Sequence, residues 1–203
     1  MRLARIFPER REPRAAPCRC LIAKAIVLIA CCGLLVGANR GFGAETSLTE
    51  YQVKALFLLN FAKYVDWPPV AFAQSNTPIL IGLYGEDKFG DALKKAVGGK
   101  TISGRGIIIQ PIEKDDIWGN FHILFISDSE KKRLGEILLK IKTLPVLTVG
   151  ETDQFLEQGG MINFVKKEGK VRLEINLNAA RQANLQINSQ LLKVADVVKG
   201  KTN

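Results

Sequence analysis

Cysteine is missing from most of this 203-residue sequence: the chain has four cysteines, and none lies beyond Cys32. Residues 45–203 therefore contain no thiol for nucleophilic catalysis, no thiolate ligand for zinc and no disulfide. A chain of about 160 residues buries close to 70% of its unfolded surface, so it can fold without such cross-links. The absence of cysteine thus excludes thiol and redox chemistry from this part of the chain.

Histidine is almost as scarce, because His122 is the only one. It lies in an apolar run without companion ligands, so we interpret it as a buried or strand-surface residue and not as a metal ligand or catalytic base. The run Gly98–Thr101 lacks the first glycine of a phosphate-binding loop, and neither a Gly-x-Ser-x-Gly motif nor a Cys–His pair occurs. We interpret the acidic residues near predicted turns as helix caps and loop charges, namely Glu86, Asp87, Asp115, Asp116 and Asp128. The sequence therefore predicts no enzymatic activity, no cofactor and no metal site.

Positive charge is unevenly distributed along the chain. The formal net charge is +9, but residues 1–44 hold eight of the 29 basic side chains and only two of the 20 acidic ones. The other 21 basic and 18 acidic side chains are well mixed, so the long-range field of residues 45–203 is weak. This balance excludes nucleic acid as a partner.

The first 44 residues have the pattern of an export signal. Seven basic side chains between Arg2 and Lys24 precede an uncharged apolar run over residues 25–38. Such a run is short for a membrane span of roughly 20 residues and typical of a signal peptide. We predict a signal peptide over residues 1–44, cleavage after Gly43 or Ala44, and a periplasmic mature chain. An uncleaved N-terminal anchor stays open, as does a lipoprotein acylated at Cys31, because residues 28–31 resemble a lipobox.

Helical and strand-like segments alternate after the leader. A capping box at Ser47–Glu50 predicts a helix over residues 51–64, which Pro68 and Pro69 terminate. Short apolar runs between turn residues predict strands, and the segments between them predict helices capped by Asp87 and Ser127. We expect strands over residues 78–84, 105–110, 121–126 and 145–149, and helices over residues 88–97, 130–142 and 152–158.

The alternation of predicted strands and helices ends after Gly160. Residues 161–166 and 171–176 predict an antiparallel hairpin at the edge of the sheet. Short helices are expected over residues 177–183 and 189–198, the second capped by Ser189. The whole pattern predicts one α/β domain over residues 45–203, with three layers, a largely parallel sheet, flanking helices and a C-terminal antiparallel hairpin.

Four aromatic side chains recur toward the end of the first predicted helix and just beyond it: Phe57, Phe61, Tyr64 and Trp67. One interpretation is that they fill the core beneath the sheet. The other is that they form a partly exposed contact surface for a partner protein.

The order of several motifs is distinctive. They are Tyr51-x-x-Lys54-Ala55-x-Phe57-x-x-Asn60-Phe61-x-Lys63-Tyr64-x-x-Trp67-Pro68, Val146-Leu-Thr-Val149-Gly-Glu151, Gly159-Gly160-Met-Ile-Asn163-Phe164, Glu174-Ile-Asn176 and Ile187-Asn-Ser189-Gln-Leu191-Leu192. In this order, and over nearly the whole chain after residue 50, they resemble the YfiR family of periplasmic proteins. We interpret the matching landmarks first as structural: Tyr64, Trp67, Pro68, Gly159, Gly160, Asn163, Glu174, Asn176 and Ser189.

The resemblance implies a regulatory function without catalysis. Better-understood members of this family repress an inner-membrane diguanylate cyclase by binding its periplasmic sensor domain, which restrains cyclic-di-GMP signalling and biofilm formation. It therefore implies as partner the periplasmic domain of such a cyclase or of a sensor kinase, and we keep a homodimer open. Some members carry cysteines in the mature domain, whereas this chain has none there, so disulfide-based control is not expected.

A rival hypothesis is a periplasmic small-ligand-binding protein. Ligands of open α/β sheets bind in the crevice beyond the carboxyl ends of the parallel strands. In this sequence two predicted strands end near Tyr84–Gly85 and near Ser127–Asp128. A ligand site would therefore lie at these two strand ends.

Overall fold

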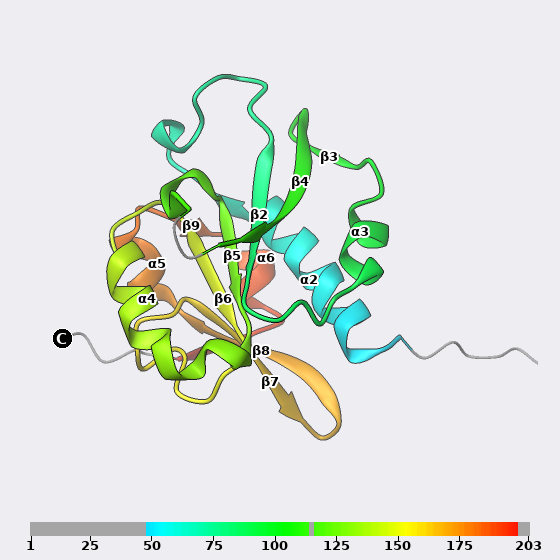
Figure 1. Cartoon of the computed structure of the whole chain (residues 1–203), viewed down its shortest axis with the longest axis vertical. Coiled ribbons are helices and arrows are strands. Elements are labelled where there is room, and N and C mark those ends of the chain that lie inside the picture. The colour runs from blue at the N-terminus through cyan, green and yellow to red at the C-terminus, as the bar shows by residue number, and fades with distance from the viewer. Residues whose placement is uncertain (1–47, 114–115, 199–203) are drawn as a thin grey trace, which may run out of the picture. The chain divides into compact units, whose positions relative to one another are not determined.

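An eight-stranded sheet forms the centre of the computed structural model, which describes residues 48–113 and 116–198 (Figure 1). Its strand order is β10-β8-β7-β6-β5-β2-β4-β3, and only the β7–β8 and β3–β4 pairs are antiparallel. The strands are β2 (Ile79–Tyr84), β3 (Thr101–Ile102), β4 (Arg105–Ile112), β5 (Ile123–Ile126), β6 (Leu147–Gly150), β7 (Ile162–Lys167), β8 (Lys170–Asn176) and β10 (Asp196–Val198). Strands β2, β5 and β6 are almost entirely apolar because both faces of the sheet are covered there, and Thr148 in β6 is the buried polar exception.

Helices cover both faces of this sheet. The α-helices are α2 (Glu50–Tyr64), α3 (Asp91–Val97), α4 (Leu134–Ile141), α5 (Leu177–Gln182) and α6 (Ser189–Leu192). Figure 1 shows α2 and α3 on one side of the strands and α4 on the other. Three short 3-10 helices (Pro69–Ala71, Trp118–Asn120 and Asp128–Arg133) and a two-stranded antiparallel sheet of β1 (Val65–Asp66) with β9 (Gln186–Ile187) complete the domain. Within the described residues, no helix combines the length and hydropathy needed to cross a bilayer.

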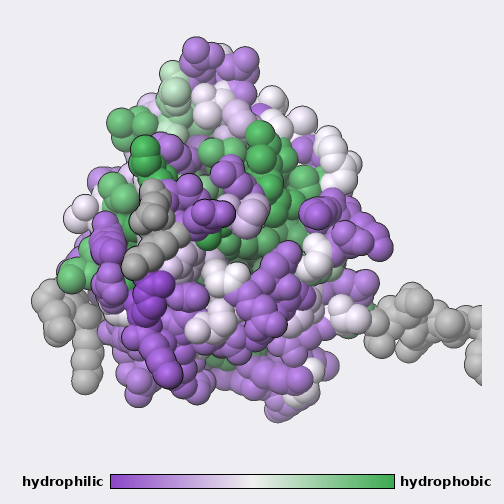
Figure 2. Space-filling model, viewed as in Figure 1, coloured by the Kyte–Doolittle hydropathy of each residue, from purple (hydrophilic) through white to green (hydrophobic). Residues whose placement is uncertain are grey.

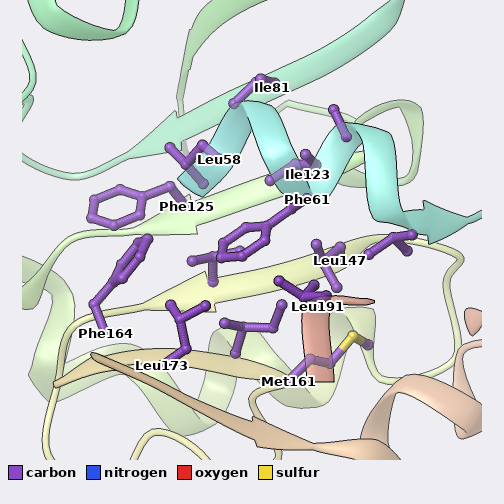
Figure 3. Close-up of a cluster of buried hydrophobic side chains, with 14 of the residues drawn as sticks. Leu58, Phe61, Ile81, Ile123, Phe125, Leu147, Met161, Phe164, Leu173 and Leu191 are labelled. Atoms are coloured by element: carbon purple, nitrogen blue, oxygen red, sulfur yellow. The ribbon is translucent and has the colours of Figure 1, made fainter. Parts of the chain in front are cut away.

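Each face of the sheet has its own hydrophobic core. On the α2 side the core includes Leu58, Phe61, Ile81, Ile123, Phe125, Leu147, Phe164 and Leu173, which are labelled in Figure 3. On the α4 side it includes Leu124, Ile126, Leu134, Ile137, Ile141 and Phe155. Successive residues of β5 alternate between the two cores, as the period of a strand requires. The predicted α/β class, with a largely parallel sheet between helical layers, is confirmed.

The predicted antiparallel hairpin is also confirmed, but its position at the sheet edge was wrong. Residues 162–167 pair with residues 170–176 as β7 and β8. Beyond β8 the chain returns as β10, which pairs with β8 in parallel. Residues 196–198, predicted as the end of a helix, are therefore a strand, because the open edge of β8 offered unpaired backbone groups.

The helix starts differ from the predicted caps. Helix α2 is capped by Thr49, whose capping-box partner is Gln52, and not by Ser47 with Glu50. Asp87 does not cap α3: its carboxylate accepts hydrogen bonds from the amides of Phe89 and Gly90, which closes a turn before the helix begins at Asp91. At α2 the Thr49 side chain takes the amide that a cap must satisfy, whereas the Asp87 carboxylate is used up in its own turn and no side chain caps α3.

Two predicted helices are shorter or absent. Residues 128–133 form a 3-10 helix that Ser127 caps, and the α-helical part starts only at Leu134. Residues 152–158 form turns and no helix. Asn188, not Ser189, caps α6, because its side chain accepts the amide of Gln190. The predicted leader, with Cys31, Gly43 and Ala44, lies outside the described residues.

Candidate functional site

The carboxyl ends of β2, β5 and β6 surround a cleft of about 630 Å³. In the sheet, β4 lies on one side of β2 and β5 lies on the other. The chain runs from β2 to β4 in one direction across the sheet and from β5 to β6 in the opposite direction, so the strand order reverses between β2 and β5. Such reversal points leave a crevice in open α/β sheets. We call this cleft the charged cleft, and its walls are Glu50, Tyr51, Lys54, Lys88, Asp128, Glu151, Asp153, Asn163, Phe164, Val165, Lys166 and Val171.

The Glu151 carboxylate is the hub of the charged cleft. Residue 151 directly follows β6, and its side chain is only 5% exposed. The Tyr51 hydroxyl donates to both of its oxygens at 3.0 Å, and the Lys54 ammonium lies 2.6 Å from Oε2. Lys88, on the loop after β2, approaches Oε1 at 3.5 Å. Three donors from two separate segments thus compensate one buried negative charge.

The first turns of α2 place two of these donors. Residues 51 and 54 are three positions apart, so a helix presents them on one face. Lys54 also pairs with Glu50, four residues earlier, at 2.6 Å, and its side chain is 6% exposed. A buried lysine is tolerated here because carboxylates lie on two sides of its ammonium group.

Contacts within the cleft shift the pKa values of Asp128, Lys88 and Tyr51. A hydrogen bond from Lys88 lowers the pKa of Asp128, and the same contact raises the pKa of Lys88. Burial, together with the nearby Glu151 carboxylate, raises the pKa of Tyr51, so this phenol stays a donor. The Lys88–Asp128 contact therefore favours the charged forms of both side chains. Within the described ranges, no group of three or more His, Cys, Asp or Glu side chains is arranged to hold a metal ion.

Two buried polar atoms lack partners, one on the cleft-wall residue Asn163 and one on Thr152, to which Asn163 is bonded. The Asn163 side-chain amide donates to the Thr152 carbonyl oxygen at 3.1 Å, which fixes the orientation of the amide. Its Oδ1 atom and the Thr152 hydroxyl have no hydrogen-bond partner among the described residues. Most buried polar atoms are paired, so this pair of atoms marks an unusual position.

The four aromatic residues do not form one surface. Phe61 is fully buried and stacks against Phe164 with ring centres 5.9 Å apart, so it belongs to the core and not to a contact surface. Phe57 and Tyr64 are half-buried. Trp67 is half-buried too, but its indole N–H donates to the backbone oxygen of His122 at 3.1 Å.

Phe57 and Tyr64 line a separate groove of about 440 Å³ between α2, β8 and the C-terminal segment. We call it the contact groove, and it is lined by Phe57, Asn60, Tyr64, Val171, Arg172, Gln190, Leu191 and Val194. Val194 is 57% exposed, so an apolar surface faces solvent here. Val171 lines both this groove and the charged cleft. A second apolar surface gathers over β2 and β4, where Ile108 is 47% exposed (Figure 2).

His122 is 2% exposed and has aromatic neighbours. Its Nδ1 accepts the backbone N–H of Leu80 at 3.1 Å, so Nε2 carries the proton of the neutral ring. Phe72 stacks on the imidazole with ring centres 4.5 Å apart. Burial lowers the pKa of His122 below its usual value of 6.5. These contacts place it in the fold and away from the charged cleft.

Most of the other motif residues have a structural contact. Asn176 caps α5, accepting from the amides of Asn178 and Ala179, and also donates to the Leu156 oxygen. Gly159 has a φ of +103°. Gly160 packs so closely on Phe155 that a Cβ atom would lie 2.2 Å from its ring. The remaining motif contacts are the ion pair of Glu174 with Lys167 at 3.1 Å, the Tyr64 backbone oxygen that accepts from Asn188, Pro68 as the residue before a 3-10 helix, and Ser189 as the first residue of α6.

A family model described as YfiR/HmsC-like matches residues 51–196, which span the described domain from α2 to β10. The chain belongs to the YfiR/HmsC-like family. This family is periplasmic, regulatory and known for control of cyclic-di-GMP signalling. No curated protein matches the chain. Both the charged cleft and the contact groove are built from residues within the matched range.

Sequence reasoning located the crevice of this YfiR/HmsC-like domain but missed its charged residues. Of the two expected strand ends, Asp128 lines the cleft, whereas Tyr84 and Gly85 are not among its walls. Tyr51, Lys54 and Glu151 all stood in the recognised motifs, yet nothing in the sequence paired them across about 100 positions. Glu151 is a charged motif residue directly after a predicted strand, and this position is the sequence feature that could have identified it as a site residue.

Proposed function

We propose that this protein binds the periplasmic sensor domain of an inner-membrane signalling protein of the diguanylate cyclase class and holds it in its inactive state. The match to the YfiR/HmsC-like family over residues 51–196 carries this proposal. A sensor kinase with a periplasmic domain is the second partner class. Repression lowers the cyclic-di-GMP output of the cell, and with it biofilm formation.

The contact groove is the surface that we assign to this partner. It combines the half-buried aromatic rings of Phe57 and Tyr64 with the exposed Val194, while Asn60 and Arg172 supply a polar rim. Apolar pockets with aromatic walls and polar rims are typical of the energetic centres of protein interfaces. Trp67 lies at a different place, beside Pro68 and Pro69, and is the second contact candidate.

Binding alone is sufficient for this regulation. A protein that binds one state of a sensor more tightly than the other shifts their equilibrium by that difference in affinity. A tenfold shift requires only about 1.4 kcal/mol. The proposed function therefore needs no catalytic group in the exported domain.

Export places the protein on the side of the membrane where the sensor domain lies. We propose that a signal peptide over residues 1–44 is removed after Gly43 or Ala44. Acylation at Cys31 is the alternative, and it would tether the domain to a membrane.

The test compares cyclic-di-GMP in a strain lacking this protein with the same strain complemented by variants. Deletion should raise cyclic-di-GMP and biofilm mass, and the wild-type gene should restore both. Asn60→Arg places a bulky charge in the contact groove without removing a buried side chain, because Asn60 is exposed. This variant should accumulate normally and fail to restore repression.

Gln182→Arg supplies the matched control, since it introduces the same side chain on the exposed surface of α5, outside the groove. It should complement like the wild type. Unchanged cyclic-di-GMP after deletion, in a strain whose cyclic-di-GMP level responds to other inputs, would contradict the proposed function. Full repression by Asn60→Arg would show that the partner does not bind at the contact groove, and Trp67 would then be tested as the contact residue.

A further inference from the structure

Strand β4 is unpaired on its outer side over most of its length. Strand β3, its outer neighbour, pairs only with Arg105 and Gly106, whereas β2 pairs with residues 107–112 on the inner side (Figure 1). Among the described residues, no turn or loop of the chain forms a backbone hydrogen bond to residues 107–111. We call residues 107–111 the open edge of the sheet.

The turn between β3 and β4 determines which backbone groups of the open edge face outward. Arg105 follows the two-residue turn Ser103–Gly104 and pairs with the last residue of β3. Residues that flank such a turn exchange both of their backbone hydrogen bonds, so the N–H and C=O of Arg105 point outward. This direction alternates along a strand, so the backbone groups of Ile107, Ile109 and Pro111 point outward too. Pro111 has no N–H, and strands accept proline where that direction is unpaired.

The open edge lacks the charged side chains that protect many sheet edges. Its sequence is Ile-Ile-Ile-Gln-Pro, so none of its side chains is ionised. Ile108 is 47% exposed and belongs to the apolar surface over β2 and β4 (Figure 2). Natural proteins usually shield an exposed edge with charges or a covering segment, because an unshielded edge pairs with another strand. Pro111 shields only the last position, so the rest of the edge can receive a strand.

Opposite charges flank the two ends of the open edge. Lys100 and Arg105 lie at the β3 end, and Glu113 and Asp116 form the turn that follows the other end. Arg105 donates to two backbone oxygens, but none of the four side chains has an ion-pair partner in the part of the chain that the structure describes. A second copy running antiparallel brings the basic end of each chain beside the acidic end of the other. The charges therefore favour self-pairing in the antiparallel direction.

We propose that a second copy of this chain pairs antiparallel with the open edge and forms a two-fold symmetric dimer. Ile109 faces Ile109 of the partner subunit, and Ile107 faces Pro111 of the partner subunit. This register uses the whole open edge and no residue that β3 already occupies. A register centred on Ile108 would place the partner strand opposite Gly106, where β3 lies. The same edge is used by both copies, so the assembly closes at two chains.

The dimer leaves the contact groove free. The groove is lined by residues of β8, and β8 and β4 stand toward opposite ends of the strand order. One dimer therefore presents two contact grooves, one on each copy. The proposal stands on the open edge and does not depend on the identity of the protein that the groove binds.

The first test measures the mass of the protein in solution, purified as it accumulates in the cell envelope. Analytical ultracentrifugation over a wide range of protein concentrations should show a species with twice the mass of one chain. The share of this species should rise with concentration, as mass action requires. A monomer at every concentration would overturn the proposal and leave the open edge to a strand of another protein.

Cysteine substitutions at exposed positions of β4 then locate the interface and its register. Ile108 faces Gln110 of the partner subunit in a non-hydrogen-bonded pair, whose Cα atoms lie about 4.5 Å apart, within reach of a disulfide. Ile108→Cys and Gln110→Cys are purified separately, mixed in reductant and oxidised. The mixture should yield about tenfold more cross-linked dimer than either variant alone, because identical positions lie about 7 to 8 Å apart across the axis.

Mass spectrometry of the linked peptides identifies this disulfide, because every native cysteine lies at or before Cys32. Gln182→Cys, on the exposed surface of α5, is the control and should give no linked peptide when it is mixed with Ile108→Cys. Ile108 and Gln110 are exposed, so their variants should melt close to the wild type. A dimer that lacks the disulfide between positions 108 and 110 would overturn the proposal. So would efficient cross-linking of Ile108→Cys with itself, which requires another register.

Discussion

The Lys54 ammonium lies 2.6 Å from the Glu151 carboxylate, and both side chains are nearly buried. This pair joins the second turn of α2 to the end of β6, 97 positions apart in the chain. Glu151 also accepts the Tyr51 hydroxyl, so two residues of one helix turn are fixed to the same strand end. The pair thereby sets the position of α2, which carries one wall of the contact groove, against the sheet.

Removing one member of this pair should be costly. Lys54→Met leaves the Glu151 carboxylate buried with fewer donors, and we expect the free energy of unfolding to fall by about 3 kcal/mol. The double variant Lys54→Met with Glu151→Leu should be more stable than the sum of the single changes predicts, because neither charge is then left uncompensated. Urea denaturation of the four proteins measures this coupling. Strict additivity would show that the pair contributes nothing of its own.

The stability of the fold should fall on mild acidification because of His122. Its pKa is lowered in the folded state, so the unfolded chain takes up a proton first as the pH falls through about 6.5. The contribution of the neutral imidazole is complete above that pH and is lost between it and the folded-state pKa, at no more than about 1.4 kcal/mol per pH unit.

A non-titrating variant isolates this effect. His122→Gln keeps a side-chain acceptor within reach of the Leu80 amide and should flatten the slope of unfolding free energy against pH between about pH 7 and pH 5. Carboxylates titrate mostly below this window. A slope equal to that of the wild type would assign the pH dependence to other groups.

Gly160 should tolerate no side chain. A Cβ atom there would lie 2.2 Å from the ring of Phe155, which is fully buried. Gly160→Ala should therefore destabilise the protein by roughly 1 to 3 kcal/mol through overpacking. Gly106 on β4 has open space around it, so Gly106→Ala should leave the melting temperature unchanged or raise it slightly.

Asn176 should matter more than an ordinary helix cap. Its side chain is 4% exposed, caps α5 with two hydrogen bonds and donates a third to the Leu156 oxygen. We expect Asn176→Ala to cost roughly 2 to 3 kcal/mol, since the Leu156 carbonyl also loses one of its two donors, the other being the Gly159 amide. Asn188→Ala, which removes the exposed cap of α6, should cost about 1 kcal/mol. Equal losses in thermal unfolding would contradict the special role of Asn176.

Local patterns were sufficient for the elements that lie in the core. The apolar run of β2 and the run that contains β5 have turn residues on both sides, so burial on two faces was readable before any contact was known. The cap at Thr49 was misjudged because several polar side chains near that helix start could satisfy the same amides. The turn at Asp87 was misjudged because an aspartate can bond to amides two and three residues on without starting a helix there. Strand β10 was missed because its pairing depends on the open edge of β8 and not on its own three residues.

The amino-acid sequence by itself determined the α/β alternation, the family and the place of the crevice at the strand ends, because these follow from local periodicity and from motifs read in order. Only the tertiary structure decided that Tyr51, Lys54, Lys88 and Glu151 form one network, and that Phe61 is core while Phe57 and Tyr64 line a groove. The reason is physical: an ion pair and the exposure of a side chain depend on distances between segments far apart in the chain, and a linear pattern carries no such distance.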